Sequence, residues 1–128
     1  MVTRMSSNRI VHFEIHCPNI EQGVKFYQDV FNWQTQKWPG PEVYHLATTG
    51  PETERGINGG LMASRDGQPR TVNTIAVDDL DAMIKKSVAH GGRNVVPRMP
   101  IPGVGWLAYC TDPGGNIFGL MQHDENAK

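Results

Sequence analysis

The sequence predicts an α+β fold in which two tandem βαβββ modules form one domain over about residues 9–123. An internal repeat carries this prediction. "PGPEVYHLA" (39–47) and "PIPGVGWLA" (100–108) agree at five of nine positions, at an offset of 61. The tripeptide Gly-Leu-Met occurs at residues 60–62 and again at 119–121, at an offset of 59. Because surrounding segments match as well as the short motif, the repeat indicates a duplicated unit.

The first module is expected over about residues 9–64. It opens with "VHFEIHC" (11–17), whose alternation of apolar and polar residues indicates a strand. The helix "NIEQGVKFYQDVF" follows, with Asn19 as its N-cap and Gln22 completing a capping-box pattern. Asn32 ends the helix, since asparagine tolerates the left-handed conformation. The apolar stripe of this helix is Ile20, Val24, Tyr27 and Phe31.

The second module, over about residues 71–123, repeats this order. "TVNTIAV" (71–77) is its strand, and the next helix is capped by Asp79 and ended by Gly91. The stripe of that helix is Leu80, Met83, Ile84 and Val88. Three further strands are expected in each module, at about 33–38, 42–49 and 57–63, and at about 94–99, 104–110 and 116–122.

Composition excludes several classes of function. The chain has 128 residues and a net charge of −1 with both signs spread along it. This balance predicts no nucleic-acid partner and no membrane-surface partner. No apolar run approaches the length of a membrane span, and no secretory signal is visible at the start. Cys17 and Cys110 form no CxxC pair, so we expect two free thiols and a cytoplasmic protein.

Alternation along the strands predicts which side chains line a cleft. In the first strand, Val11, Phe13, Ile15 and Cys17 form the apolar set that should pack on the helix, while His12, Glu14 and His16 form a polar face. In the last strand, Phe118 and Leu120 should face the helix. The repeat extends this pattern to the other strands. The predicted ligand-binding cleft is lined by His12, Glu14, His45, Met62, Trp106, Gly119 and Met121.

Three segments together resemble the vicinal-oxygen-chelate superfamily, which includes glyoxalases, bleomycin-resistance proteins and extradiol dioxygenases. They are "VHFEIHCPNIEQGVKFYQDVFNW", "IAVDDLDAMIKKSVAHGG" and "DPGGNIFGL", and the resemblance covers about residues 9–122. It implies curved sheets that enclose a funnel. It also implies pairing into a homodimer and an unidentified small-molecule ligand.

Metal-dependent members of this superfamily hold one divalent ion with four residues, two from each module. The resemblance places those positions at His12, Val72, Gly119 and either Gly59 or Gly60. Only His12 carries a donor side chain. A slip of one residue would replace Val72 by Asn73, a poor zinc ligand. His12 and His16 cannot share an ion, since four residues of strand span ~13 Å. A rebuilt site would use His12 with Glu14, and His45 could join it from a neighbouring strand.

Three functions remain open at this point. The favoured one is a small-molecule binding protein without a cofactor. The alternative is a glyoxalase- or dioxygenase-like enzyme with Zn, Ni, Mn or Fe at a rebuilt site around His12. Such an ion would polarise substrate oxygens, and Glu14 would move a proton. The third is a structural or interaction module whose cleft is filled by its own side chains.

Overall fold

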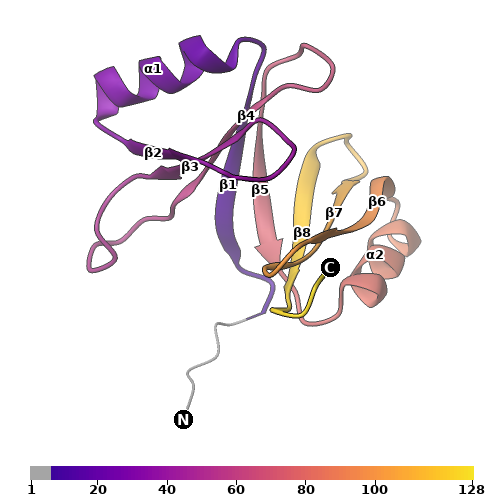
Figure 1. Cartoon of the computed structure of the whole chain (residues 1–128). Coiled ribbons are helices and arrows are strands. Elements are labelled where there is room, and N and C mark those ends of the chain that lie inside the picture. Colours follow the sequence, from indigo (N-terminus) through magenta and orange to yellow (C-terminus); the bar gives the residue numbers. More distant parts are fainter. Residues whose placement is uncertain (1–6) are drawn as a thin grey trace. The chain divides into compact units, whose positions relative to one another are not determined.

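A computed structural model describes residues 7–128 and confirms the predicted order of elements (Figure 1). The elements are β1 (Ile10–Cys17), α1 (Ile20–Phe31), β2 (Gln34–Lys37), β3 (Tyr44–Thr48), β4 (Gly59–Ala63), β5 (Arg70–Ala76), α2 (Leu80–Ala89), β6 (Arg93–Ile101), β7 (Gly105–Thr111) and β8 (Ile117–His123). Each half therefore reads strand, helix and three strands. No helix within residues 7–128 is long and apolar enough to cross a membrane.

The first compact unit, Val11–Val72, holds the first module. Its strands lie in the order β2-β3-β4-β1. β1 and β4 pair in parallel, and the β2–β3 and β3–β4 pairs are antiparallel. Helix α1 packs on one face of this sheet (Figure 1). The approach is close at Gly23, where a Cβ would lie 2.6 Å from the Cys17 sulfur.

The second unit contains Asn73–Lys128 and the segment that leads into β1, so the boundary between the units falls within β5. Its strands lie in the order β5-β8-β7-β6, with β5 and β8 parallel and the other pairs antiparallel. Helix α2 packs against β6, β7 and β8. The residues just before β1 belong to this unit because Asn8 N donates to Ala76 O at 2.6 Å and Ala76 N donates to Arg9 O at 2.9 Å.

Both helices begin and end much as their sequence signals predict. Asn19 Oδ1 accepts from Gln22 N at 3.1 Å, and Asp79 Oδ1 accepts from Ala82 N at 3.1 Å. Asn32 takes the left-handed conformation at φ 58°. The predicted stripes are buried only in part, since Phe31 and Val88 in the last turns are 55% and 51% exposed. The buried core of the second module is Val77, Leu80, Ala108, Cys110 and Leu120.

Candidate functional site

The register of β1 on β4 defines a polar face in the first module. Glu14 pairs with Gly60 and His16 pairs with Met62. Paired residues share a face and neighbours along a strand alternate, so His12 lies on this face too. Phe13 pairs with Gly59 on the opposite face. We call the surface that carries His12, Glu14, His16, Gly60 and Met62 the His12 face.

Two ionisable side chains of the His12 face are buried. Glu14 is 5% exposed and His16 is 8% exposed. Glu14 Oε1 and His16 Nε2 lie 3.3 Å apart, within hydrogen-bonding distance. Burying a carboxylate costs free energy unless partners compensate it, and such groups concentrate at functional sites. This pair therefore marks the His12 face as the best candidate site in the first module.

His12 is hydrogen-bonded to Tyr44, a residue that is not among the predicted cleft residues. His12 Nε2 and Tyr44 Oη are 2.7 Å apart, and the two rings stack at a centroid distance of 6.4 Å. Burial lowers the pKa of His12 below its ordinary value, and the nearby Glu14 carboxylate opposes that shift. Burial, which penalises the charged imidazolium, is the larger of the two effects. The His12 imidazole is therefore neutral at neutral pH.

Tyr44 reaches His12 by passing over Gly60. A Cβ built on Gly60 would collide with the Tyr44 phenol, and Gly60 itself is buried. The absence of a side chain at Gly60 therefore leaves the space that the Tyr44 ring occupies. The signal for Tyr44 is its place on β3. It lies two residues before Leu46, the partner of Gly60, and so on the same face.

The predicted position of His45 is wrong. His45 pairs with Leu61, so it lies on the face opposite His12, together with Phe13. Its neighbour Leu46 pairs with Gly60 and takes the place on the face of His12 that was predicted for His45. Since the side-chain period of a strand is two, an error of one residue moves every side chain of the strand to the other face.

In the second module, Gly119 and Met121 lie on the face predicted for them. Gly119 pairs with Thr74 on β5 and with Tyr109 on β7. A Cβ on Gly119 would lie 3.2 Å from Thr74 Oγ1 and 3.6 Å from Tyr109 Cε1. Phe118 and Leu120 lie on the other face, among the core residues that pack with α2, as predicted.

The predicted position of Trp106 is also wrong. Its ring packs against the core cluster that contains Leu80 and Leu120, so it lies on the face opposite Gly119. Trp106 Nε1 donates to Asp124 Oδ2 at 3.0 Å, and the Arg98 guanidinium carbon lies 4.2 Å above the ring. These contacts give Trp106 a structural role at the edge of the core.

The register shows on which strand face each of the positions lies that the resemblance assigns to metal ligands. Gly60 shares the face of His12 and Gly59 does not. Thr74 pairs with Gly119 as Glu14 pairs with Gly60, so Thr74 is the equivalent of Glu14 in the second module. Val72, two residues earlier, is then the equivalent of His12. Asn73 pairs with Phe118 and lies on the other face. Within residues 7–128, no group of three His, Cys, Asp or Glu side chains is placed to hold an ion. With apolar side chains or none at Val72, Gly60 and Gly119, these residues do not fit the superfamily's four-ligand metal site.

Neither cysteine has the properties of a reactive thiol. Cys17 and Cys110 are both buried and free. Burial raises the pKa of each thiol, and at Cys110 an Asn94 hydrogen bond opposes the rise only in part. A nucleophilic cysteine needs a lowered pKa, so the environment of these two free thiols is that of unreactive cysteines.

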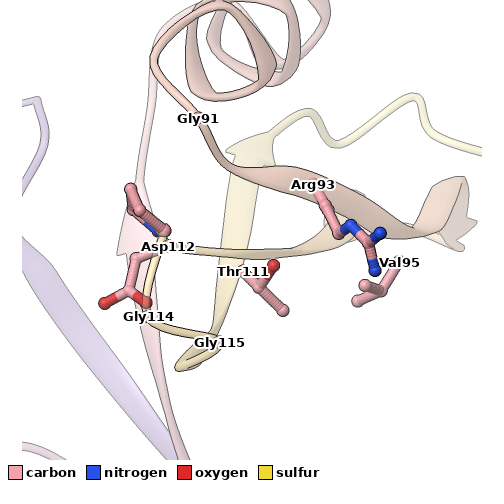
Figure 2. Close-up of a pocket in the computed structure, with 8 residues that line it drawn as sticks. Gly91, Arg93, Val95, Thr111, Asp112, Gly114 and Gly115 are labelled. Atoms are coloured by element: carbon pink, nitrogen blue, oxygen red, sulfur yellow. The ribbon is translucent and has the colours of Figure 1, made fainter.

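A surface hollow of about 330 Å³ lies in the second module, beside the turn between β7 and β8; Figure 2 shows residues that line it. Its lining residues are Gly91, Arg93, Val95, Thr111, Asp112, Pro113, Gly114 and Gly115. The Asp112 carboxylate accepts from the backbone N and from Nδ2 of Asn116, both at 2.9 Å, and these bonds lower its pKa. Asp112 therefore holds the turn together, and the hollow contains none of the predicted site residues.

Residues 9–120 match the sequence profile of the Glyoxalase/Bleomycin resistance protein/Dioxygenase superfamily. The match covers most of the chain, and the chain therefore belongs to this family. It is also similar to the protein named "Putative glyoxylase CFP32" from Mycobacterium tuberculosis (strain CDC 1551 / Oshkosh) and to its Mycobacterium bovis counterpart. Identity to each is 37% over 102 residues, which is 77% of this chain. The chain spans only 39% of the length of these relatives.

Solved structures share the fold at low sequence identity. Methylmalonyl-CoA epimerase from Mycobacterium tuberculosis is 17% identical, with a TM-score of 0.69 over 97% of this chain and 93% of that chain. The Mn(II)-bound glyoxalase from Novosphingobium aromaticivorans is 18% identical, with a TM-score of 0.61 over 98% of this chain and 41% of that chain. These likenesses confirm the predicted fold class of paired βαβββ modules.

Proposed function

We propose that this protein binds a small molecule at the His12 face and does so without the divalent ion that metal-dependent relatives use. The observation that carries the proposal is the cluster of polar groups on one face of β1: the buried Glu14–His16 pair beside the His12–Tyr44 pair. Ligand sites commonly combine apolar walls with a few placed polar groups. Met62 on the same face supplies such a wall.

The chemistry of the His12 face favours a ligand with oxygen acceptors. A neutral imidazole and a phenol bind carbonyl or carboxylate oxygens by hydrogen bonds rather than by charge. Among the structural neighbours, one epimerase was solved with methylmalonyl-CoA and NH4+, and another, from Streptomyces coelicolor, with 2-nitronate-propionyl-CoA. Both ligands carry oxygens of this kind, which makes methylmalonyl-CoA a suitable first probe for this protein.

Ligand binding is tested by NMR on the full chain. Methylmalonyl-CoA, free coenzyme A and bleomycin are added separately while the ring signals of His12 and His123 are followed. We expect at least one compound to shift the His12 signal and to raise the unfolding temperature. His12→Asn should abolish the rise, and His123→Asn, at an exposed position, should keep it. A rise in unfolding temperature that His12→Asn leaves unchanged would refute binding at this face.

A metal-dependent enzyme is the second candidate, and the Glu14 carboxylate near His12 favours it. In that case Glu14 would move a proton on the bound substrate. The candidate requires that His12 and Glu14 hold an ion together. Elemental analysis of protein purified without chelator decides between the two candidates, because only the second predicts stoichiometric Zn, Ni, Mn or Fe that His12→Ala removes.

We also propose a homodimer in the cytoplasm, on the basis of the family resemblance and the free buried thiols. Light scattering coupled to size-exclusion chromatography measures the mass directly. A mass of two chains that persists on dilution supports the dimer, and a mass of one chain at all concentrations contradicts it.

A further inference from the structure

We propose that Tyr44 occupies the space from which a metal-ligating side chain at residue 60 would reach an ion on His12. On this view, the Tyr44–Gly60 pair determines that the His12 face holds no divalent cation. The inference deepens the proposed function and rests on it, since it explains in residue terms how the site recognises its ligand without a metal.

The strand register limits where further ligands for an ion on His12 could come from. An ion bound to His12 needs further ligands from the same face, and in the first module β4 is the strand hydrogen-bonded beside β1 that carries them. Gly60 and Met62 are the β4 residues on that face. A thioether is a poor ligand for the harder divalent ions. Residue 60 is therefore the β4 position from which a carboxylate could complete a site.

The Tyr44 phenol lies both against Gly60 and against His12. Any side chain at residue 60 would collide at its first carbon with the Tyr44 phenol. The same phenol is bonded to His12 Nε2 at 2.7 Å, so an ion at this nitrogen would have to displace it. Tyr44 therefore opposes metal binding twice, because it excludes the missing ligand and engages the existing one.

Tyr44 and residue 60 should therefore be coupled in their effect on metal binding. A carboxylate introduced at residue 60 can reach His12 only if the Tyr44 ring leaves its present position. We therefore expect the two substitutions together to have a larger effect than either alone. Gly119 provides a matched comparison in the second module. There a Cβ would make close but tolerable contacts, at 3.2 Å with Thr74 and 3.6 Å with Tyr109, and no histidine occupies the place of His12.

The experiment compares four forms of the full chain: wild type, Tyr44→Ala, Gly60→Glu, and the double variant Tyr44→Ala/Gly60→Glu. Each is titrated with Ni²⁺ and with Zn²⁺ by calorimetry, and the His12 ring signal is followed by NMR. We expect Gly60→Glu alone to lower the unfolding temperature and the double variant to recover part of that loss. We also expect the double variant to bind at least about tenfold more tightly than either single variant, a change that calorimetry resolves easily.

The matched control is the double variant with His12→Ala, which should lose the gain. If the first double variant does not fold, Tyr44→Ala/Gly60→Asp supplies a shorter carboxylate for the same comparison. A folded double variant that binds ions no better than the single variants would overturn the inference. So would wild-type protein that binds one ion through His12.

The two proposals fail separately. A wild-type protein that binds methylmalonyl-CoA at His12, with no gain of metal affinity in the double variant, keeps the proposed function and rejects the role of Tyr44. A gain of metal affinity in the double variant, with no small molecule bound by the wild type, supports the role of Tyr44 and rejects the proposed function.

Discussion

At the scale of single residues, His12 has an environment that keeps its imidazole neutral. Burial lowers its pKa, Tyr44 occupies Nε2, and the Glu14 carboxylate offsets the shift only in part. The unfolded chain has no such environment, so its histidines titrate near the ordinary value of 6.5. The difference between these two states links the stability of the fold to pH.

The sign of the link follows from the lowered pKa. As pH falls through 6.5 toward the native pKa of His12, the unfolded chain takes up a proton that the native protein does not. The free energy of unfolding should therefore decrease as pH falls through this window, and less so in His12→Asn. Urea unfolding at a series of pH values measures the decrease. An NMR titration that places the pKa of His12 above 6.5 would contradict the account.

A second residue-scale prediction compares two glycines. Gly60→Ala should lower the free energy of unfolding by about 1–3 kcal/mol, the usual cost of forced overpacking, because its methyl collides with the Tyr44 phenol. Gly119→Ala should cost less, since its contacts are longer. In a Tyr44→Ala background most of the cost at residue 60 should disappear. Urea unfolding of Gly60→Ala, Gly119→Ala, Tyr44→Ala and Tyr44→Ala/Gly60→Ala measures these costs. Equal costs at both glycines would reject the explanation.

At the scale of elements, the caps show how local sequence fixes helix ends. Asn19→Ala and Asp79→Ala should each cost about 1 kcal/mol, because each removes the acceptor for a backbone N–H in the first turn. Asn19→Asp and Asp79→Asn keep that acceptor and should stay near the wild-type stability. Thermal and urea unfolding test both pairs, and a loss in the conservative variants equal to that in the alanine variants would exclude capping as the cause.

The elements were predictable from sequence, but two strand faces were not. β1 has clear alternation, and its polar face was assigned correctly. In β7, Leu107, Ala108, Tyr109 and Cys110 are all buried, so polarity gives no contrast between its two faces. β3 has the same ambiguity, since Leu46 is apolar and faces the side of His12. A strand with apolar residues on both faces reveals its register only through its partners.

At the scale of the whole molecule, the duplication explains both the success and the shared error of the prediction. The repeat correctly paired Gly60 with Gly119 and Met62 with Met121, and these positions have equivalent places in the two modules. The same repeat carried an error of one residue from one module to the other, so His45 and Trp106 were both assigned to the wrong face of their strands. Tyr44 was missed because the repeat places Gly105 at its equivalent position and so offered no second signal.

The central claim is that a family member with one donor side chain left among the four ligand positions recognises its ligand without a metal ion. Elemental analysis of the full chain, purified without chelator and then loaded with Zn, Ni, Mn or Fe and dialysed, tests this claim most directly. The account predicts no stoichiometric metal in either sample and no rise in unfolding temperature after loading. Stoichiometric metal that His12→Ala removes would contradict it.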